Sequence, residues 1–165
     1  MSRPILSWVA VFAAAACTAV PDAENVTARP PAAQQPAPEA PSPQPLASIN
    51  IPSGRCGMTL WMASGSGIEP IFQSLDVTTA TMNLDGNAAP LQLEEQSGPI
   101  QLGMRARQVF KPVSDHKTTE HVELKLEWGD RFPGGLYVRG GTLTVSGADG
   151  WGRVLPVAGI AGCKA

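Results

Sequence analysis

Apolar and polar residues alternate strictly in the segment from His121 to Trp128. Val122, Leu124 and Leu126 occupy every second position before Trp128, with polar or charged residues between them. Successive side chains of a β-strand point to opposite faces, so this pattern indicates a strand with one face in a core and one in water. Within residues 48–165, no segment keeps apolar residues at helical spacing for more than two turns. The sequence therefore predicts an all-β domain.

The alternation recurs in shorter segments that are separated by turn signals. Ala80, Met82 and Leu84 precede Asp85-Gly86, a pair typical of tight hairpins, and a second Asp-Gly pair stands at Asp149-Gly150. Further strands are expected at Met58–Met62, Met104–Phe110 and Leu136–Val138, and bulges or corners at Gly134-Gly135 and Gly140-Gly141. We predict a small antiparallel barrel or sandwich of seven or eight strands within residues 48–165.

A proline-rich segment precedes this domain. Eight of the 27 residues from Pro21 to Ala47 are proline, and large apolar side chains are almost absent between them. Such a composition cannot bury enough surface to offset the entropy of ordering, and proline favours extended polyproline II. We interpret residues 17–47 as a disordered linker that separates the domain from whatever holds the N-terminus.

The first 16 residues have the order of an export signal. Arg3 supplies a positive charge, Ile5–Ala16 is a short apolar run, and small residues end it. About 12 residues at 1.5 Å each are too short to cross a hydrocarbon core of about 30 Å. We therefore expect residues 1–16 to be a signal peptide and not a membrane-spanning helix.

The segment Ala14-Ala15-Ala16-Cys17 resembles the lipobox of bacterial lipoprotein precursors. The resemblance implies that Cys17 receives acyl chains such as palmitate and becomes the new N-terminus, so that the partner of the anchor is the membrane. Lipobox sequences usually carry Leu where this chain has Ala14, and ordinary cleavage after Ala16 or Ala19 is the alternative. Thr18 resembles the residue of lipoproteins sorted to the outer membrane, which implies a domain facing the periplasm.

The three cysteines of the chain are consistent with this interpretation. With Cys17 lipidated, Cys56 and Cys163 remain, one near each end of the domain. In an oxidising compartment we expect a disulfide that joins the first strand to the last, whereas two separate thiols are the alternative.

Charge and composition exclude some classes of function. The net charge is −2, and the chain has only one Tyr, four Phe and four Trp. A nucleic-acid-binding protein normally has a strongly basic surface and aromatic stacking residues, so we expect no nucleic-acid partner.

One cluster of side chains has the chemistry of a metal site. It consists of Asp115, His116, Glu120 and His121, and it fails the spacing of His-x-x-Glu-His metallopeptidases by one residue. Since Pro112 and the strand pattern put His116 in a loop and His121 on a solvent face, we interpret the cluster as solvated surface. We expect no metal, no cofactor and no catalytic residue.

Parts of the domain resemble the membrane-bound lysozyme inhibitors, small periplasmic lipoproteins with a disulfide-closed β-barrel. The shared features are Cys56, the strand and turn of residues 81–86, the pair Ser97-Gly98 and Cys163. The resemblance implies binding residues at Ser97 and Lys111. Gln101 stands where the family has Tyr, and Pro112 follows Lys111 where the family has Gly.

The sequence thus favours an exported, lipid-anchored β domain that binds a ligand or an envelope partner, or has a structural role, and catalyses nothing. The alternatives are a periplasmic lysozyme inhibitor and a metal-dependent envelope enzyme that uses His116, Glu120 and His121.

Overall fold

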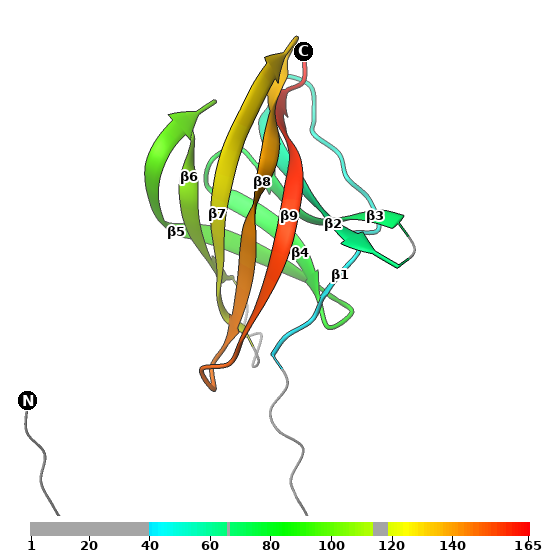
Figure 1. Ribbon diagram of the computed structural model, residues 1–165, viewed down its shortest axis with the longest axis vertical. Helices are drawn as coiled ribbons and strands as arrows, with labels where there is room; N and C mark the ends of the chain where they lie inside the picture. Colours follow the sequence, from blue (N-terminus) through cyan, green and yellow to red (C-terminus); the bar gives the residue numbers. More distant parts are fainter. Residues whose placement is uncertain (1–39, 66, 114–118) are drawn as a thin grey trace, which may run out of the picture. The chain divides into compact units, whose positions relative to one another are not determined.

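Eight strands form a closed antiparallel barrel, and a ninth short strand pairs with the end of one of them (Figure 1). The computed structural model describes residues 40–65, 67–113 and 119–165. The strands are β1 (Pro43–Gln44), β2 (Cys56–Ser64), β3 (Gly67–Leu75), β4 (Thr79–Leu84), β5 (Asn87–Gln101), β6 (Met104–Pro112), β7 (Thr119–Phe132), β8 (Gly135–Gly147) and β9 (Gly152–Cys163). The predicted all-β class is confirmed, and of the two predicted architectures the barrel is present.

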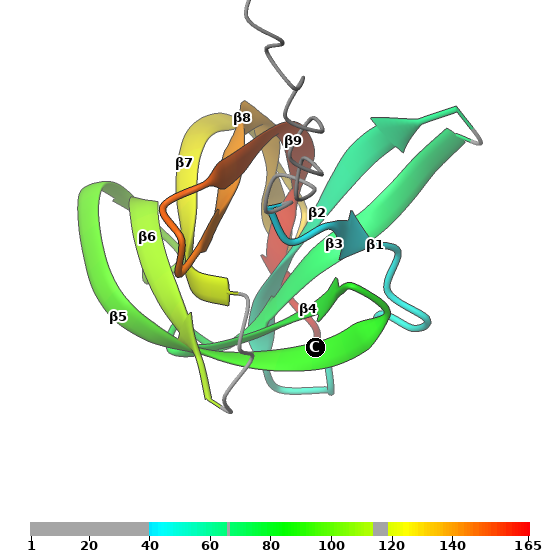
Figure 2. The same cartoon turned by 90° about the horizontal axis from the view of Figure 1, so that it is seen from below.

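The strands of the barrel are arranged in chain order, which is the up-and-down connectivity. Each strand from β2 to β9 pairs antiparallel with the next one along the chain, and β9 returns to pair with β2. Figure 2, seen from below, shows the strands arranged around the interior. Closure of the sheet removes most of the unpaired strand edges that an open sheet would expose.

The interior of the barrel is filled with side chains. The predicted alternation in β7 is confirmed, because Val122, Leu124 and Leu126 are buried. At the centre, the rings of Phe72 and Phe110 meet edge to face with centroids 5.5 Å apart. The other large side chains that are fully buried belong to Met58, Leu60, Ile71, Met82, Leu91, Met104, Leu124, Leu136, Leu143 and Gln108. A barrel of eight strands is just wide enough to be packed in this way, so the interior is a core.

The predicted disulfide between Cys56 and Cys163 is present. The two residues are register partners at the start of β2 and the end of β9. The bond therefore fastens the two strands whose pairing closes the barrel.

Glycines allow the strands to approach closely where the sheet bends. A Cβ atom on Gly159 of β9 would lie 2.2 Å from the carbonyl oxygen of Thr59, and one on Gly141 of β8 would lie 2.4 Å from that of Lys125. Gly141 also follows the register shift between β8 and β9, which confirms the predicted bulge at Gly140-Gly141.

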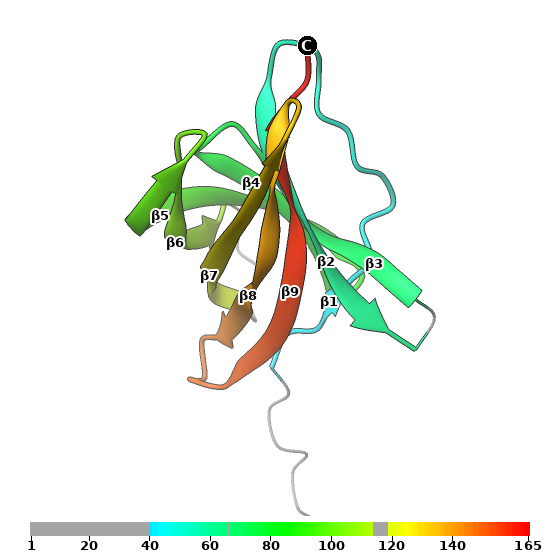
Figure 3. The same cartoon turned by 45° about the horizontal axis from the view of Figure 1, so that its top comes forward.

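The barrel wall opens on one side, where the outer half of the β2–β3 hairpin leaves its neighbours. β2 pairs with β9 only up to the partners Trp61 and Ala158, and β3 pairs with β4 only from Phe72 onward. Figures 1 and 3 both show the hairpin projecting from the barrel beside β9. On that side the remaining length of β9 has no strand partner among the described residues.

Residues 40–47, which the sequence assigned to the linker, already contact the sheet. Pro43 and Gln44 form β1 and pair with Leu84 and Asn83 of β4. The backbone N–H of Ser42 donates a 2.8 Å hydrogen bond to a carboxylate oxygen of Asp85. Proline is tolerated here because the strand lies at a sheet edge, where a missing N–H breaks no ladder. Among the described residues, the ordered part of the chain therefore begins before Ser48.

Candidate functional site

An open hollow of the described surface lies on the outer face of β9. Along this strand Val157 and Ala161 point into the core, so Pro156, Ala158 and Ile160 point outward. The side chains of Pro156 and Ala158 are small, so they rise only a little above the surface of the sheet. These three residues form the floor of an open groove of about 720 Å³, which we call the hairpin groove.

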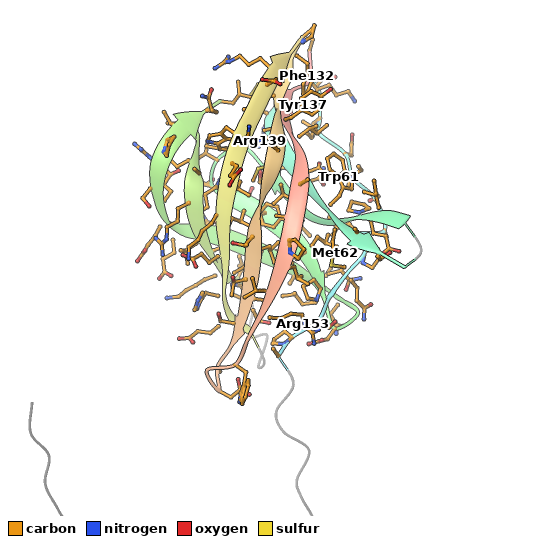
Figure 4. The ribbon with its side chains drawn as sticks, in the orientation of Figure 1. Trp61, Met62, Phe132, Tyr137, Arg139 and Arg153 are labelled. Carbon is orange, nitrogen blue, oxygen red and sulfur yellow. A yellow bond between two sulfur atoms is a disulfide. The ribbon has the colours of Figure 1, made fainter. Side chains whose placement is uncertain are left out.

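Large apolar side chains form the walls of the hairpin groove. On one side stand Trp61 and Met62 of β2 and Ile68 of β3, and on the other stands Tyr137 of β8. Figure 4 shows Trp61 on the side of the hairpin and Tyr137 on the side of β8. Ile68 is 77% exposed and Tyr137 is 52% exposed, so both walls offer apolar surface to a ligand. The projecting hairpin is what gives the groove its first wall.

A second groove of about 410 Å³ continues along β9 toward the C-terminus. We call it the terminal groove. Trp61 and Ile160 line both grooves, so the two meet at these side chains. Ile49, from the segment before β2, and Phe132, from the end of β7, supply apolar walls, and Lys164 lines the far end. The ring of Phe132 also packs against that of Tyr137, with centroids 5.0 Å apart.

The backbone beneath the terminal groove is already hydrogen-bonded within the sheet, whereas Pro156 and Val157 under the hairpin groove pair only with β8. Residues 159–162 of β9 pair with β2 on one side and with β8 on the other. Pro156, farther along the floor, has no N–H to donate. The floor of the terminal groove thus presents carbon to a ligand and few main-chain polar groups.

The charges around the grooves differ in how they are neutralised. In the hairpin groove, Arg139 lies 3.5 Å from a carboxylate oxygen of Glu127, and Asp130 is a second nearby acid. In the terminal groove, Lys164 forms no ion pair with any residue of the described part of the chain. Lys164 is therefore the cation that the grooves leave available.

A network of ion pairs covers a different face of the barrel, on β5, β6 and β7. Arg107 donates a 2.7 Å hydrogen bond to Glu123 and lies 3.4 Å from Glu95, and both bonds raise the pKa of Arg107. Burial alone would raise the pKa of Glu123, but hydrogen bonds from Lys125 and Arg107 outweigh it and hold that pKa below its ordinary value. These charges neutralise one another, which is typical of a solvated surface.

The two binding residues implied by the lysozyme-inhibitor resemblance are not brought together. Ser97 pairs with Arg107 on β6, and Lys111 lies four residues farther along that strand, a separation of about 13 Å. The ammonium group of Lys111 pairs with Glu94, and that hydrogen bond raises the pKa of Lys111. The pair therefore forms no common site in this structure.

The other predicted site residues are only partly described. Glu120 and His121 lie at the start of β7, beside the ion-pair network. Asp115, His116 and Cys17 fall outside the described residues, so the structure does not bear on lipidation. Within residues 40–65, 67–113 and 119–165, no group of three His, Cys, Asp or Glu is arranged to hold a metal ion.

The grooves were missed from the sequence, although one signal pointed to them. From Val154 to Ala161, β9 is an unbroken run of apolar residues and glycine, without the alternation seen in β7. A continuous apolar run is typical of a strand that is covered on both faces. In this barrel one face of β9 meets the core, and the described residues leave the other face uncovered.

No helix in the described part of the chain is long and apolar enough to cross a membrane. Comparison with protein-family models, with curated proteins and with solved structures found no match to this chain.

Proposed function

We propose that this protein is an exported, lipid-anchored binding module of the cell envelope that holds its ligand in the grooves on the outer face of β9. The observation that carries the proposal is the hairpin groove, about 720 Å³ in volume and walled by Trp61, Tyr137 and Ile68. Pockets of this size with mainly apolar and aromatic walls are the usual sites of small ligands.

The filled interior supports an outer binding site. Ligand-binding barrels of eight strands often hold a small molecule inside, but here Phe72, Phe110 and their neighbours occupy that space. Binding therefore falls to the outer surface, and the opening of the wall beside the β2–β3 hairpin supplies the concave part of it.

The lipid anchor and envelope location rest on the sequence alone. The apolar run Ile5–Ala16, the lipobox-like end at Cys17 and the proline-rich linker are the features that support them. We propose an outer-membrane lipoprotein whose domain faces the periplasm.

The groove is tested with a neutral solvatochromic dye such as Nile red. We expect the full chain carrying Cys17→Ser to bind the dye with a blue shift of its emission, because the grooves remove it from water. Ile160→Gln should abolish most of this signal. Val154→Gln is the matched control, since Val154 also lies on β9 and is exposed, but lines neither groove. An unchanged signal in Ile160→Gln would contradict the proposal.

The anchor is tested by the intact mass of protein expressed from the whole sequence and extracted from membranes without reductant. We expect a chain that begins at Cys17, carries the mass of added acyl groups and lacks two hydrogens for the Cys56–Cys163 bond. Cys17→Ser should leave the membrane fraction. A soluble wild-type chain without acyl mass would rule out the anchor.

A further inference from the structure

We propose that the joined hairpin and terminal grooves bind the hydrocarbon chain of an anionic amphiphile with a single aliphatic chain, and that Lys164 binds its head group. This inference rests on the proposed function and names the chemical class of its ligand. Fatty acids and lysophospholipids share this chemistry, and the experiment below distinguishes them.

The shape of the site fits one extended aliphatic chain. From Pro156 to Lys164 the grooves follow β9 for eight residues, or about 26 Å at 3.3 Å per residue. A membrane acyl chain spans half of a hydrocarbon core of about 30 Å, or about 15 Å. The grooves are therefore long enough for such a chain and its head group.

In the terminal groove, the hydrogen bonding of the floor favours hydrocarbon over peptide. A peptide needs partners for its own N–H and C=O groups, and burying them without partners is costly. Residues 159–162, at the floor of the terminal groove, have their main-chain groups directed to β2 and β8. A saturated chain needs no such partners, so it loses nothing on this floor and gains contact with Trp61 and Ile160.

The charge of the site places an anionic head at the C-terminal end. Arg55, whose carbonyl oxygen accepts a hydrogen bond from the N–H of Lys164, pairs with Asp76, and Arg139 of the hairpin groove lies 3.5 Å from Glu127. Lys164 forms no such pair among the described residues. A carboxylate or phosphate head at this position would give Lys164 the partner that the protein does not supply.

Calorimetric titration of the full chain carrying Cys17→Ser tests the inference. The probes are laurate, lauroyl lysophosphatidylglycerol and dodecyltrimethylammonium, each below its critical micelle concentration. We expect the two anions to bind and the cation to bind at least severalfold more weakly. Lys164→Gln should weaken laurate about two- to fivefold, as for loss of an exposed ion pair, and Lys164→Glu more. Lys125→Glu is the matched control, because Lys125 lies outside both grooves.

The outcomes separate this inference from the proposed function. Binding of only one anion supports the inference and assigns the head as carboxylate or phosphate. If Nile red binds but neither anion does, or if the cation binds equally well, the inference is overturned and the binding module stands. If neither the dye nor any amphiphile binds, both the inference and the proposed function are overturned. Dimerisation in sedimentation experiments that Ile160→Gln abolishes would assign the grooves to a second copy and overturn the inference.

Discussion

Trp61 on β2 and Ile160 on β9 stand diagonally across the strand pair that closes the barrel, and both point outward. In the register, Trp61 lies opposite Ala158 and Ile160 lies opposite Thr59. The two side chains form the boundary shared by the hairpin and terminal grooves. Beyond Trp61, β2 no longer pairs with β9, so the site begins where the closure of the barrel ends. The stability of that closure therefore determines the shape of the grooves.

Removal of the disulfide should destabilise the domain strongly. The bond between Cys56 and Cys163 closes a loop with a sequence separation of 107 residues. The double substitution Cys56→Ser and Cys163→Ser is expected to lower the free energy of unfolding by about 2–5 kcal/mol. Urea unfolding measures the change. Cys17→Ser, which affects neither bridge residue, should unfold like the wild type, and equal stability of all three proteins would contradict the prediction.

Gly159→Ala should separate β9 from β2 at the boundary of the grooves. Its Cβ atom would lie 2.2 Å from the carbonyl oxygen of Thr59, so the backbone must move. We expect a loss of stability of about 1–3 kcal/mol, the range typical of overpacking, together with reduced dye binding. In the control Gly152→Ala, on the same strand, the nearest atom is 3.6 Å away. An equal loss of stability for Gly159→Ala and Gly152→Ala in thermal unfolding would refute this explanation.

The ion pairs of Glu123 should make stability depend on acidic pH. Hydrogen bonds from Lys125 and Arg107 hold the pKa of this carboxylate below its ordinary value of 4.5. Its contribution is therefore complete above pH 4.5, declines as the pH falls through that value, and is absent below the lowered pKa of the folded state. Glu123→Gln should be less stable than the wild type at neutral pH, and the difference should vanish in strong acid. Urea unfolding across pH measures this, with Glu127→Gln as the exposed control.

The protein should leave lysozyme active. Ser97 and Lys111 are separated by about 13 Å along the sheet, and Lys111 is engaged by Glu94. We expect no change in the rate at which lysozyme clears a cell suspension when the protein is added in excess. If the protein did inhibit lysozyme, and Ser97→Ala and Lys111→Ala each relieved the inhibition, the hypothesis of a lysozyme inhibitor would be restored.

The sequence predicted those parts of the fold that depend on neighbouring residues. The alternation at Val122–Leu126 identified the buried face of β7, and Asp85-Gly86 forms the turn between β4 and β5, with positive φ at both residues. The cysteine count predicted the Cys56–Cys163 bond, because that prediction needed only an oxidising compartment and one cysteine near each end of the domain. These signals are local, or they pair two residues that have few alternatives.

The grooves could not be predicted in the same way, because they depend on where strand pairing stops. Nothing in the local pattern of β2 shows that its pairing with β9 ends at Trp61, since Met62 and Ala63 continue the strand. The prolines near Pro43 likewise indicated a linker, whereas partners on β4, distant in sequence, make that segment part of the sheet. The apolar run in β9 is visible in the sequence. It does not show whether the outer face of the strand is covered, because a covered and an uncovered face can have the same composition.

The pairing of β1 with β4 also has a mechanical consequence. A pull on the chain that precedes Ala40 would reach the barrel through a small set of contacts, namely the bond from Arg153 to Ala40, the bonds between Ser42 and Asp85, the two register pairs of β1, and the bonds of Pro45 and Leu46. These few contacts can yield one after another, while the bond between Cys56 and Cys163 prevents β2 from being drawn out beyond it. Under tension the segment before β2 would peel away as a short extensible leader and take Ile49 from the wall of the terminal groove, while the hairpin groove, which that segment does not line, would keep its shape.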